Sequence, residues 1–103
     1  RLLATVISRP TPNLAITDAG MKVLTHEFGL PEVKGVPGAK LLALAEEHGK
    51  VQLEDGPSLA AGDKIELIPS HCCTTINLHD RFFAIRNDRL EAIWDIAGRG
   101  KSQ

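Results

Sequence analysis

The chain has 103 residues, of which 43% are hydrophobic and 24% charged, so it is long enough for one globular domain and too apolar for an intrinsically disordered protein. Twelve Lys and Arg against thirteen Asp and Glu give a formal net charge of −1 without any block of like charge, which argues against nucleic acid or an anionic membrane as a partner. We find no apolar run long enough to span a membrane and no secretory leader, and we therefore expect a cytoplasmic protein.

The first half of the chain reads as short strands divided by Pro and Gly. Its opening residues form an apolar, partly β-branched run typical of a strand already under way, so we expect the chain to be a piece of a longer protein. The predicted elements are a strand at 2–7, a connector at 8–13 that holds two prolines, a brief strand at 14–17, one or two helical turns at 21–26, and a loop at 34–38.

Residues 39–54 admit two interpretations. The leucines, alanines and glutamates of 39–50, with Gly49 near the end as a C-terminal cap, favour an amphipathic helix on propensity. Alternatively, 39–45 and 50–54 form a hairpin, because Val51 and Leu53 alternate with Gln52 and Glu54 as in a half-buried strand. Local signals leave this choice open.

The last third is more regular. Residues 64–68 alternate as a strand until Pro69 ends it, and 81–86 and 89–97 flank Asn87-Asp88, a dipeptide that tolerates the positive φ of a tight hairpin turn. Leu90, Ala92, Trp94 and Ile96 are predicted to share one face. Many short strands and few good helices predict a mainly β chain, a single small β-barrel-like domain over 1–103 with short helical turns.

Reactive side chains concentrate in residues 70–80. His71 and Cys73 are one residue apart, so in an extended segment they project to the same side, whereas in a helix they diverge by about 200°. Imidazole nitrogen and thiolate sulfur favour zinc over hard cations. Two ligands are half of a structural zinc site, which makes an open, catalytic site the better metal interpretation; the competing one is a packed thiol and a hydrogen-bonded histidine.

The remaining polar candidates have plainer interpretations. His79 lacks a diagnostic spacing for a third ligand and fits a surface or capping role, and His26 and His48 lie in turn-like, solvated surroundings. Asp18 and Lys22 have the spacing of a helical ion pair. Cys72 and Cys73 cannot form an ordinary disulfide with each other because adjacent Cα atoms are too close, and free thiols fit a reducing compartment.

Several ordered motifs resemble the carboxy-terminal domain of the D-serine dehydratase and D-threonine aldolase family. They are Ile-Ser-Arg-Pro at 7–10, Asp-Ala-Gly-Met-Lys at 18–22, Glu-Glu-His-Gly at 46–49, Gly-Asp at 62–63, and Ile-Pro-Ser-His-Cys-Cys-Thr-Thr-Ile-Asn-Leu-His at 68–79. The resemblance implies a β-barrel-like domain that stands beside an alanine-racemase-like (β/α) barrel with pyridoxal phosphate on a lysine. That N-terminal barrel is absent from this chain, and none of the six lysines lies in the family's cofactor motif.

The resemblance also implies specific roles. It favours the hairpin for 39–54 and makes His71 and Cys73 the ligands of a divalent metal, zinc or else manganese, that activates the hydroxyl of a D-3-hydroxy amino acid. Cys72 would then point away from the metal, and Thr74, Thr75 and Asn77 would hydrogen-bond the ligands. The Cys73 thiolate favours zinc and dehydration, whereas aldolase members of the family often carry a carboxylate at this position.

The implied function is the metal-bearing domain of a pyridoxal-phosphate-dependent lyase, a dehydratase or an aldolase. We expect no catalytic residue in this chain beyond the metal ligands, no activity without the barrel domain, and a homodimer for the full-length protein. The alternative is a non-catalytic interaction module that docks on another protein through the apolar strand at 2–7.

Overall fold

The computed structural model describes residues 1–54 and 58–102, and it confirms a mainly β fold. One helix longer than a turn is present in this part of the chain, and it is too short to cross a membrane. The elements are β1 (Leu2–Thr11), β2 (Leu14–Thr17), β3 (Glu32–Lys34), β4 (Ala39–Leu44), β5 (Gly49–Leu53), β6 (Lys64–Ile68), α1 (Cys72–Ile76), β7 (Arg81–Arg86) and β8 (Arg89–Asp95).

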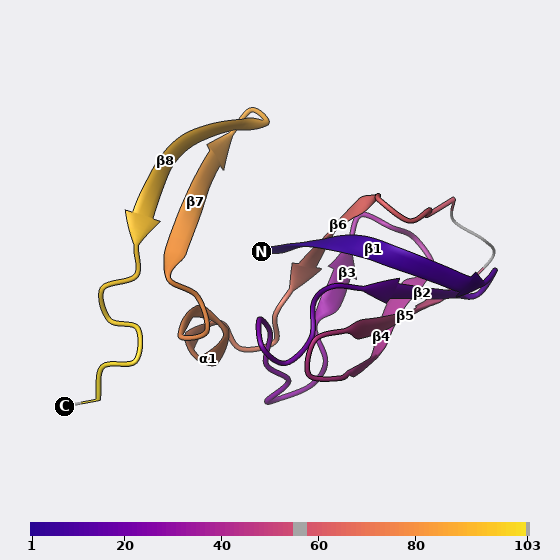
Figure 1. Ribbon diagram of the computed structural model, residues 1–103, viewed down its shortest axis with the longest axis horizontal. Helices are drawn as coiled ribbons and strands as arrows, with labels where there is room; N and C mark the ends of the chain where they lie inside the picture. The colour runs from indigo at the N-terminus through magenta and orange to yellow at the C-terminus, as the bar shows by residue number, and fades with distance from the viewer. Residues whose placement is uncertain (55–57, 103) are drawn as a thin grey trace.

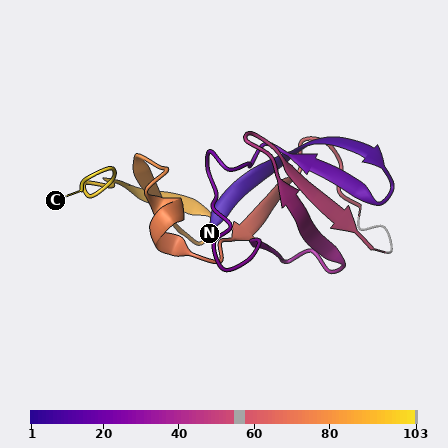
Figure 2. The same cartoon turned by 90° about the horizontal axis from the view of Figure 1, so that it is seen from below.

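Six of the strands form an antiparallel, barrel-like sheet in the order β3-β6-β1-β2-β5-β4. The strands at the two ends of this order, β3 and β4, approach each other, so the sheet nearly closes on itself. Figures 1 and 2 show α1 at one end of this sheet, between it and the hairpin formed by β7 and β8. The helix is therefore the link between the two parts of the molecule.

The core of the sheet follows from alternation along its strands. Val6 on β1, Val51 on β5 and Leu67 on β6 are fully buried, while their neighbours in sequence are more exposed, because successive side chains of a strand point to opposite faces. Leu24, from the loop between β2 and β3, completes this core although it lies outside any strand. A loop residue thus contributes to the interior that supports the site described below.

The choice at residues 39–54 is settled in favour of the hairpin. Leu41 is buried opposite Val51, a contact that a helix over 39–50 could not make. Gly49 also suits this arrangement, since a Cβ there would lie 2.7 Å from the Thr17 hydroxyl and 2.8 Å from the Ala19 carbonyl. Burial in the sheet outweighs the helix propensity of the segment.

One expectation for the first half is wrong and another holds only in part. Residues 8–11 continue β1 instead of forming a connector, because Pro10 lies where the β1–β2 register shifts between Ser8 and Thr11 and no ladder donor is required of it. Within 21–26 a single turn forms at 21–23, where the Leu24 N–H bonds to the Gly20 carbonyl (3.0 Å), and the expected second helical turn is absent. Short β3 was not predicted.

The local interactions around this turn also differ from those expected. The Asp18 carboxylate accepts a hydrogen bond from the Thr5 backbone N–H (2.7 Å), and Lys22 pairs with Glu47 instead of Asp18. These contacts join the turn to β1 and to the β4–β5 connection, so the i, i+4 pair expected from a helix is wrong.

The proposed docking strand at 2–7 is an interior strand. β1 is hydrogen-bonded to β6 on one side and to β2 on the other, so its backbone groups are not open for another protein. An interaction module that uses this strand as an edge is therefore ruled out.

The β7–β8 hairpin forms as predicted but has a bulge. Asn87 and Asp88 adopt φ values of 50° and 61° at its turn. The register shifts between Ala84 and Ile85, so Leu90 lies opposite Ile85 while Ala92 lies opposite Ala84. Because Ala84 and Ile85 are adjacent, their partners belong to opposite faces, and Leu90 does not share the face of Ala92 as the simple alternation predicted.

We predict that Gly20→Ala destabilises the fold by about 2 to 3 kcal/mol, since its Cβ would lie 2.5 Å from both the Ala45 carbonyl oxygen and the His48 nitrogen. Urea unfolding measures the change. Gly98→Ala is the matched control, because apart from its chain neighbours no described residue has an atom within 4 Å of the added methyl group. Equal midpoints for the two variants would contradict the prediction.

Candidate metal centre

The two predicted ligands lie at the junction between β6 and α1. Pro69 follows the last residue of β6, His71 has extended backbone angles (φ −136°, ψ 115°) as the residue before the helix, and Cys73 is the second helical residue. Neither the extended nor the helical geometry considered for the pair holds for both residues, because 72–76 fold into a helical turn. The pair is instead divided between an extended residue and a helical one.

The His71 ring is partly enclosed. Its side chain is 33% exposed, yet Nδ1 is buried and has no hydrogen-bond partner among the described residues. The nearest carboxylate oxygen recorded for it is Oε2 of Glu27, at 3.7 Å, and the Phe28 ring packs against the imidazole with a centroid distance of 5.2 Å. The Cys73 thiol is free and exposed.

A chain of hydroxyl groups holds the Glu27 carboxylate in this place. The Thr74 hydroxyl donates to Glu27 Oε2 (2.6 Å), and Thr25 Oγ1 lies 2.8 Å from Thr74 Oγ1 and 3.0 Å from Thr75 Oγ1. Each hydroxyl has one proton, and that of Thr74 is used on Glu27, so Thr25 donates to Thr74 and Thr75 donates to Thr25. The hydrogen bonds between these three hydroxyl groups thus all point towards Glu27.

The electrostatics of Glu27 follow from these contacts. The hydroxyl groups of Thr74 and then Thr25 lower the pKa of the Glu27 carboxyl, because they favour its charged form; the charge of His71 contributes least. Because the pKa of Glu27 is lower in the folded state, the charged carboxylate stabilises the fold at any pH above its unfolded pKa. This stabilisation is lost as the pH falls through the folded pKa.

Two further side chains connect the same loop and helix. Ser70 Oγ lies 2.6 Å from the Glu27 carbonyl and 2.7 Å from that of Gly29, and His79 Nε2 lies 2.8 Å from the Val23 carbonyl. His79 therefore has a structural partner in the backbone of the loop. The loop at 23–29 is joined to residues 70–79 along its whole length.

The roles expected for Thr74, Thr75 and Asn77 as partners of the ligands differ from the contacts observed. The two threonines bond to Glu27 and Thr25, and Asn77 Oδ1 accepts from the Gly100 N–H (2.7 Å). Proximity in sequence misled here, because the helical turn aims these side chains at other segments of the chain.

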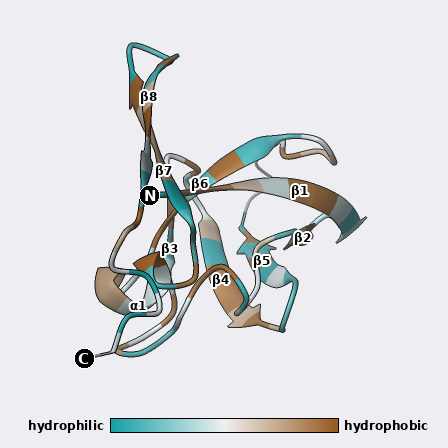
Figure 3. Ribbon diagram, turned by 60° about the vertical axis from the view of Figure 1, so that its left-hand side comes forward, coloured by the Kyte–Doolittle hydropathy of each residue, from teal (hydrophilic) through white to brown (hydrophobic). Residues whose placement is uncertain are grey.

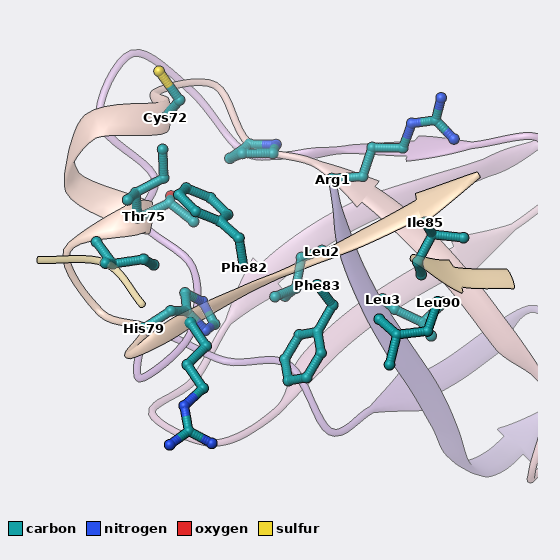
Figure 4. A pocket seen from close by; sticks show the side chains of 14 residues that line it. Arg1, Leu2, Leu3, Cys72, Thr75, His79, Phe82, Phe83, Ile85 and Leu90 are labelled. Carbon is teal, nitrogen blue, oxygen red and sulfur yellow. The ribbon is translucent and has the colours of Figure 1, made fainter. Parts of the chain in front are cut away.

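An apolar cavity of about 660 Å³ lies between the start of β1, α1 and the β7–β8 hairpin. Figure 4 shows Phe82 and Phe83 of β7 beside it, together with Cys72 of α1 and Leu2 of β1. Figure 3 shows that the hairpin bordering this cavity stands away from the sheet. Its hydrophobic residues that are more than half exposed are Phe83, Ile85, Leu90, Ile93 and Trp94.

Sequence reasoning missed the supporting residues Thr25, Glu27, Phe28 and Ser70. Phe28 has a φ of 66°, rare for a residue with a side chain, and Glu27 stands in a loop without a motif. The local signal for a loop there was the run of polar residues at 25–27 that precedes Phe28 and Gly29. Within 1–54 and 58–102 no three His, Cys, Asp or Glu side chains are grouped so as to hold a metal ion.

Comparison with known proteins identifies the domain. Residues 1–85 match the sequence model of the family described as "Putative serine dehydratase domain". The chain belongs to this family. It is 40% identical over 100 residues to 3-hydroxy-D-aspartate aldolase of Paracoccus denitrificans (97% of this chain, 26% of the relative) and 44% identical over 105 residues to D-threonine aldolase of Arthrobacter sp (99% and 27%).

A solved structure shows the same fold within a larger enzyme. D-threonine aldolase from Filomicrobium marinum matches with a TM-score of 0.90 and 36% identity over 95% of this chain and 27% of that one. The chain thus spans about a quarter of the length of these three aldolases. In these aldolases the family domain is one part of a longer lyase, as the resemblance of its motifs implied. The chain is also 31% identical over 109 residues to a protein of Mycobacterium tuberculosis, and there the match covers 96% of this chain and 82% of the relative.

We predict that Thr74→Val raises the pKa of Glu27 towards its ordinary value, because the strongest hydrogen bond to the charged carboxylate is lost. Carbon-detected NMR of the carboxyl groups during a pH titration measures the shift. Glu47, whose pKa is lowered by Lys22, is an internal control and should not move. An unchanged Glu27 pKa would show that the hydroxyl chain does not stabilise this charge.

Proposed function

We propose that this domain is the metal-bearing part of a pyridoxal-phosphate-dependent lyase that acts on D-3-hydroxy amino acids, with His71 and Cys73 as the ligands of a divalent metal. The observation that carries the proposal is the β6–α1 junction. There an imidazole, flanked by the Glu27 carboxylate and the Phe28 ring, lies two residues from a free thiol in a domain 36% identical to a D-threonine aldolase.

The residues present fit such a metal. The buried Nδ1 of His71 faces a carboxylate, which leaves Nε2 as the ring nitrogen for a ligand, and the exposed Cys73 thiol supplies sulfur. Nitrogen and thiolate sulfur together favour zinc over manganese or magnesium. Two protein ligands leave coordination positions for water and substrate, as a catalytic zinc requires.

The substrate class follows from the names of the relatives. D-Threonine and 3-hydroxy-D-aspartate are both D-amino acids with a hydroxyl on Cβ. A divalent metal at the site would act as a Lewis acid on that hydroxyl. His71 and Cys73 would hold the metal, while the Phe28 ring and the loop at 23–29 keep the imidazole in one orientation.

The pyridoxal phosphate belongs to another part of the proposed enzyme. None of the six lysines of this chain stands in a family cofactor motif, and the two aldolases of Paracoccus denitrificans and Arthrobacter sp carry about three quarters of their length outside this domain. We assign the cofactor lysine to an N-terminal (β/α) barrel and propose a homodimer for the whole protein. The chain by itself is then inactive as a lyase.

We expect the chain to bind zinc near one equivalent. His71→Ala and Cys73→Ala should each weaken binding by more than about 100-fold, because losing even an outer partner of a ligand costs 10- to 100-fold. Calorimetric titration and elemental analysis measure this. Cys72→Ala is the matched control, because it removes the neighbouring thiol and should leave zinc binding unchanged.

A second candidate is favoured by the hairpin. Its exposed apolar residues and the adjoining cavity suit a non-catalytic module that docks on another protein. The zinc titration separates the two functions. If the wild-type chain and Cys72→Ala bind no zinc, or if both ligand variants bind it as tightly as the wild type, the metal-bearing role is wrong and the interaction module becomes the better explanation.

A further inference from the structure

We infer that Glu27 is a positioning residue for His71: its carboxylate keeps the imidazole proton on Nδ1 and so presents the lone pair of Nε2 to the metal. The inference rests on the proposed function for its metal, but its physical basis lies in contacts of this chain. No motif pointed to Glu27, which is remote in sequence from residues 70–80.

The first step is the environment of Nδ1. This atom is buried without a hydrogen-bond partner among the described residues, and Glu27 Oε2 lies 3.7 Å away. If the proton were on Nε2, the Nδ1 lone pair would face a carboxylate, and two acceptors repel each other. A proton on Nδ1 turns this contact into an attraction, and a movement of about 0.7 Å would make it a hydrogen bond.

The second step is that Glu27 is held from behind. The hydrogen bonds from Thr75 through Thr25 and Thr74 all run towards Oε2, the same oxygen that faces His71. A carboxylate on a loop is normally free to rotate in water. Here three threonines restrict it, which is an arrangement suited to orienting a neighbour.

The third step concerns the backbone of the loop. Phe28 adopts the left-handed conformation (φ 66°), which residues with a Cβ rarely take, and Ser70 binds the carbonyls on either side of it. This backbone places Glu27 at one edge of the imidazole and the Phe28 ring against it. Backbone strain of this kind persists where the surroundings hold it, and it collects at functional sites.

The opposite ring nitrogen of His71, Nε2, is the one left for a metal. Histidines that bind metals commonly donate their other N–H to a carboxylate, which fixes the tautomer and the ring orientation. His71 has the carboxylate on the Nδ1 side, so Nε2 is left for the metal. Glu27 itself would not touch metal or substrate in this role.

The test compares the wild-type chain with Glu27→Gln, which keeps the size and can still accept from Thr74. Proton–nitrogen correlation NMR of the metal-free proteins at alkaline pH, where a histidine ring is neutral, reads the tautomer of His71. We expect Nδ1–H in the wild type and a shift towards Nε2–H in Glu27→Gln. Glu47→Gln is the matched control, because that exposed glutamate pairs with Lys22 instead of a histidine.

Zinc titration of the same proteins is the second readout. Glu27→Gln should bind zinc about 10- to 100-fold more weakly than the wild type, with Glu47→Gln unchanged. Thr74→Val releases the carboxylate without removing it. Its zinc affinity should therefore lie between that of the wild type and that of Glu27→Gln. Its intermediate value would not follow from simple loss of a charge.

The outcomes distinguish this inference from the proposed function. An Nε2–H tautomer in the wild type, or an identical tautomer in Glu27→Gln, overturns the role of Glu27 whether or not zinc binds. The expected tautomers without zinc binding would leave the role of Glu27 standing and overturn the metal-bearing function. Zinc affinity that is equal in Glu27→Gln and the wild type would also overturn the inference.

Discussion

The position of α1 depends on side-chain hydroxyl groups that join it to the loop at 23–29. A helix of five residues is not stable by itself, and α1 has no side-chain cap at its N-terminus. Thr25 binds Thr74 and Thr75, while Ser70 binds the backbone of the loop. Since His71 and Cys73 lie at the start of this helix, the geometry of the candidate site follows from these contacts more than from helix propensity.

The sheet and the hairpin make different contributions. The six-stranded sheet buries a continuous apolar core and nearly closes, so its stability is internal. Within the described part of the chain the β7 and β8 strands pair with each other and with no third strand, and isolated two-stranded hairpins are marginal in water. Residues such as Phe83 and Trp94 remain more than half exposed. A partner that covers this face, such as the barrel domain proposed for the whole protein, would add the support that the hairpin lacks.

Sequence predicted the features that are local and failed where distant contacts decide. Period-two alternation identified 64–68 as a strand, the Pro and Gly boundaries identified 14–17, and the Asn87-Asp88 turn identified the strand at 81–86. The segment at 39–50 stayed ambiguous because helix propensity opposed the pairing of Leu41 with Val51, which only the sheet provides. The candidates His71 and Cys73 came from their residue types, their spacing and the family resemblance, and their role as ligands stays a prediction. Glu27 was missed because its carboxylate is held by Thr74, 47 residues further on.

The orientation of His71 is determined from several independent directions. The end of β6 fixes its backbone, the Phe28 ring restricts its tilt, and the Glu27 carboxylate lies at its buried edge. A left-handed Phe28 costs on the order of 1 to 3 kcal/mol, which the sheet core and the Ser70 hydrogen bonds must offset. A histidine that merely filled space would not need this arrangement. Such a cost is understandable where one ring nitrogen has to point in a defined direction, and that is the requirement of a metal ligand.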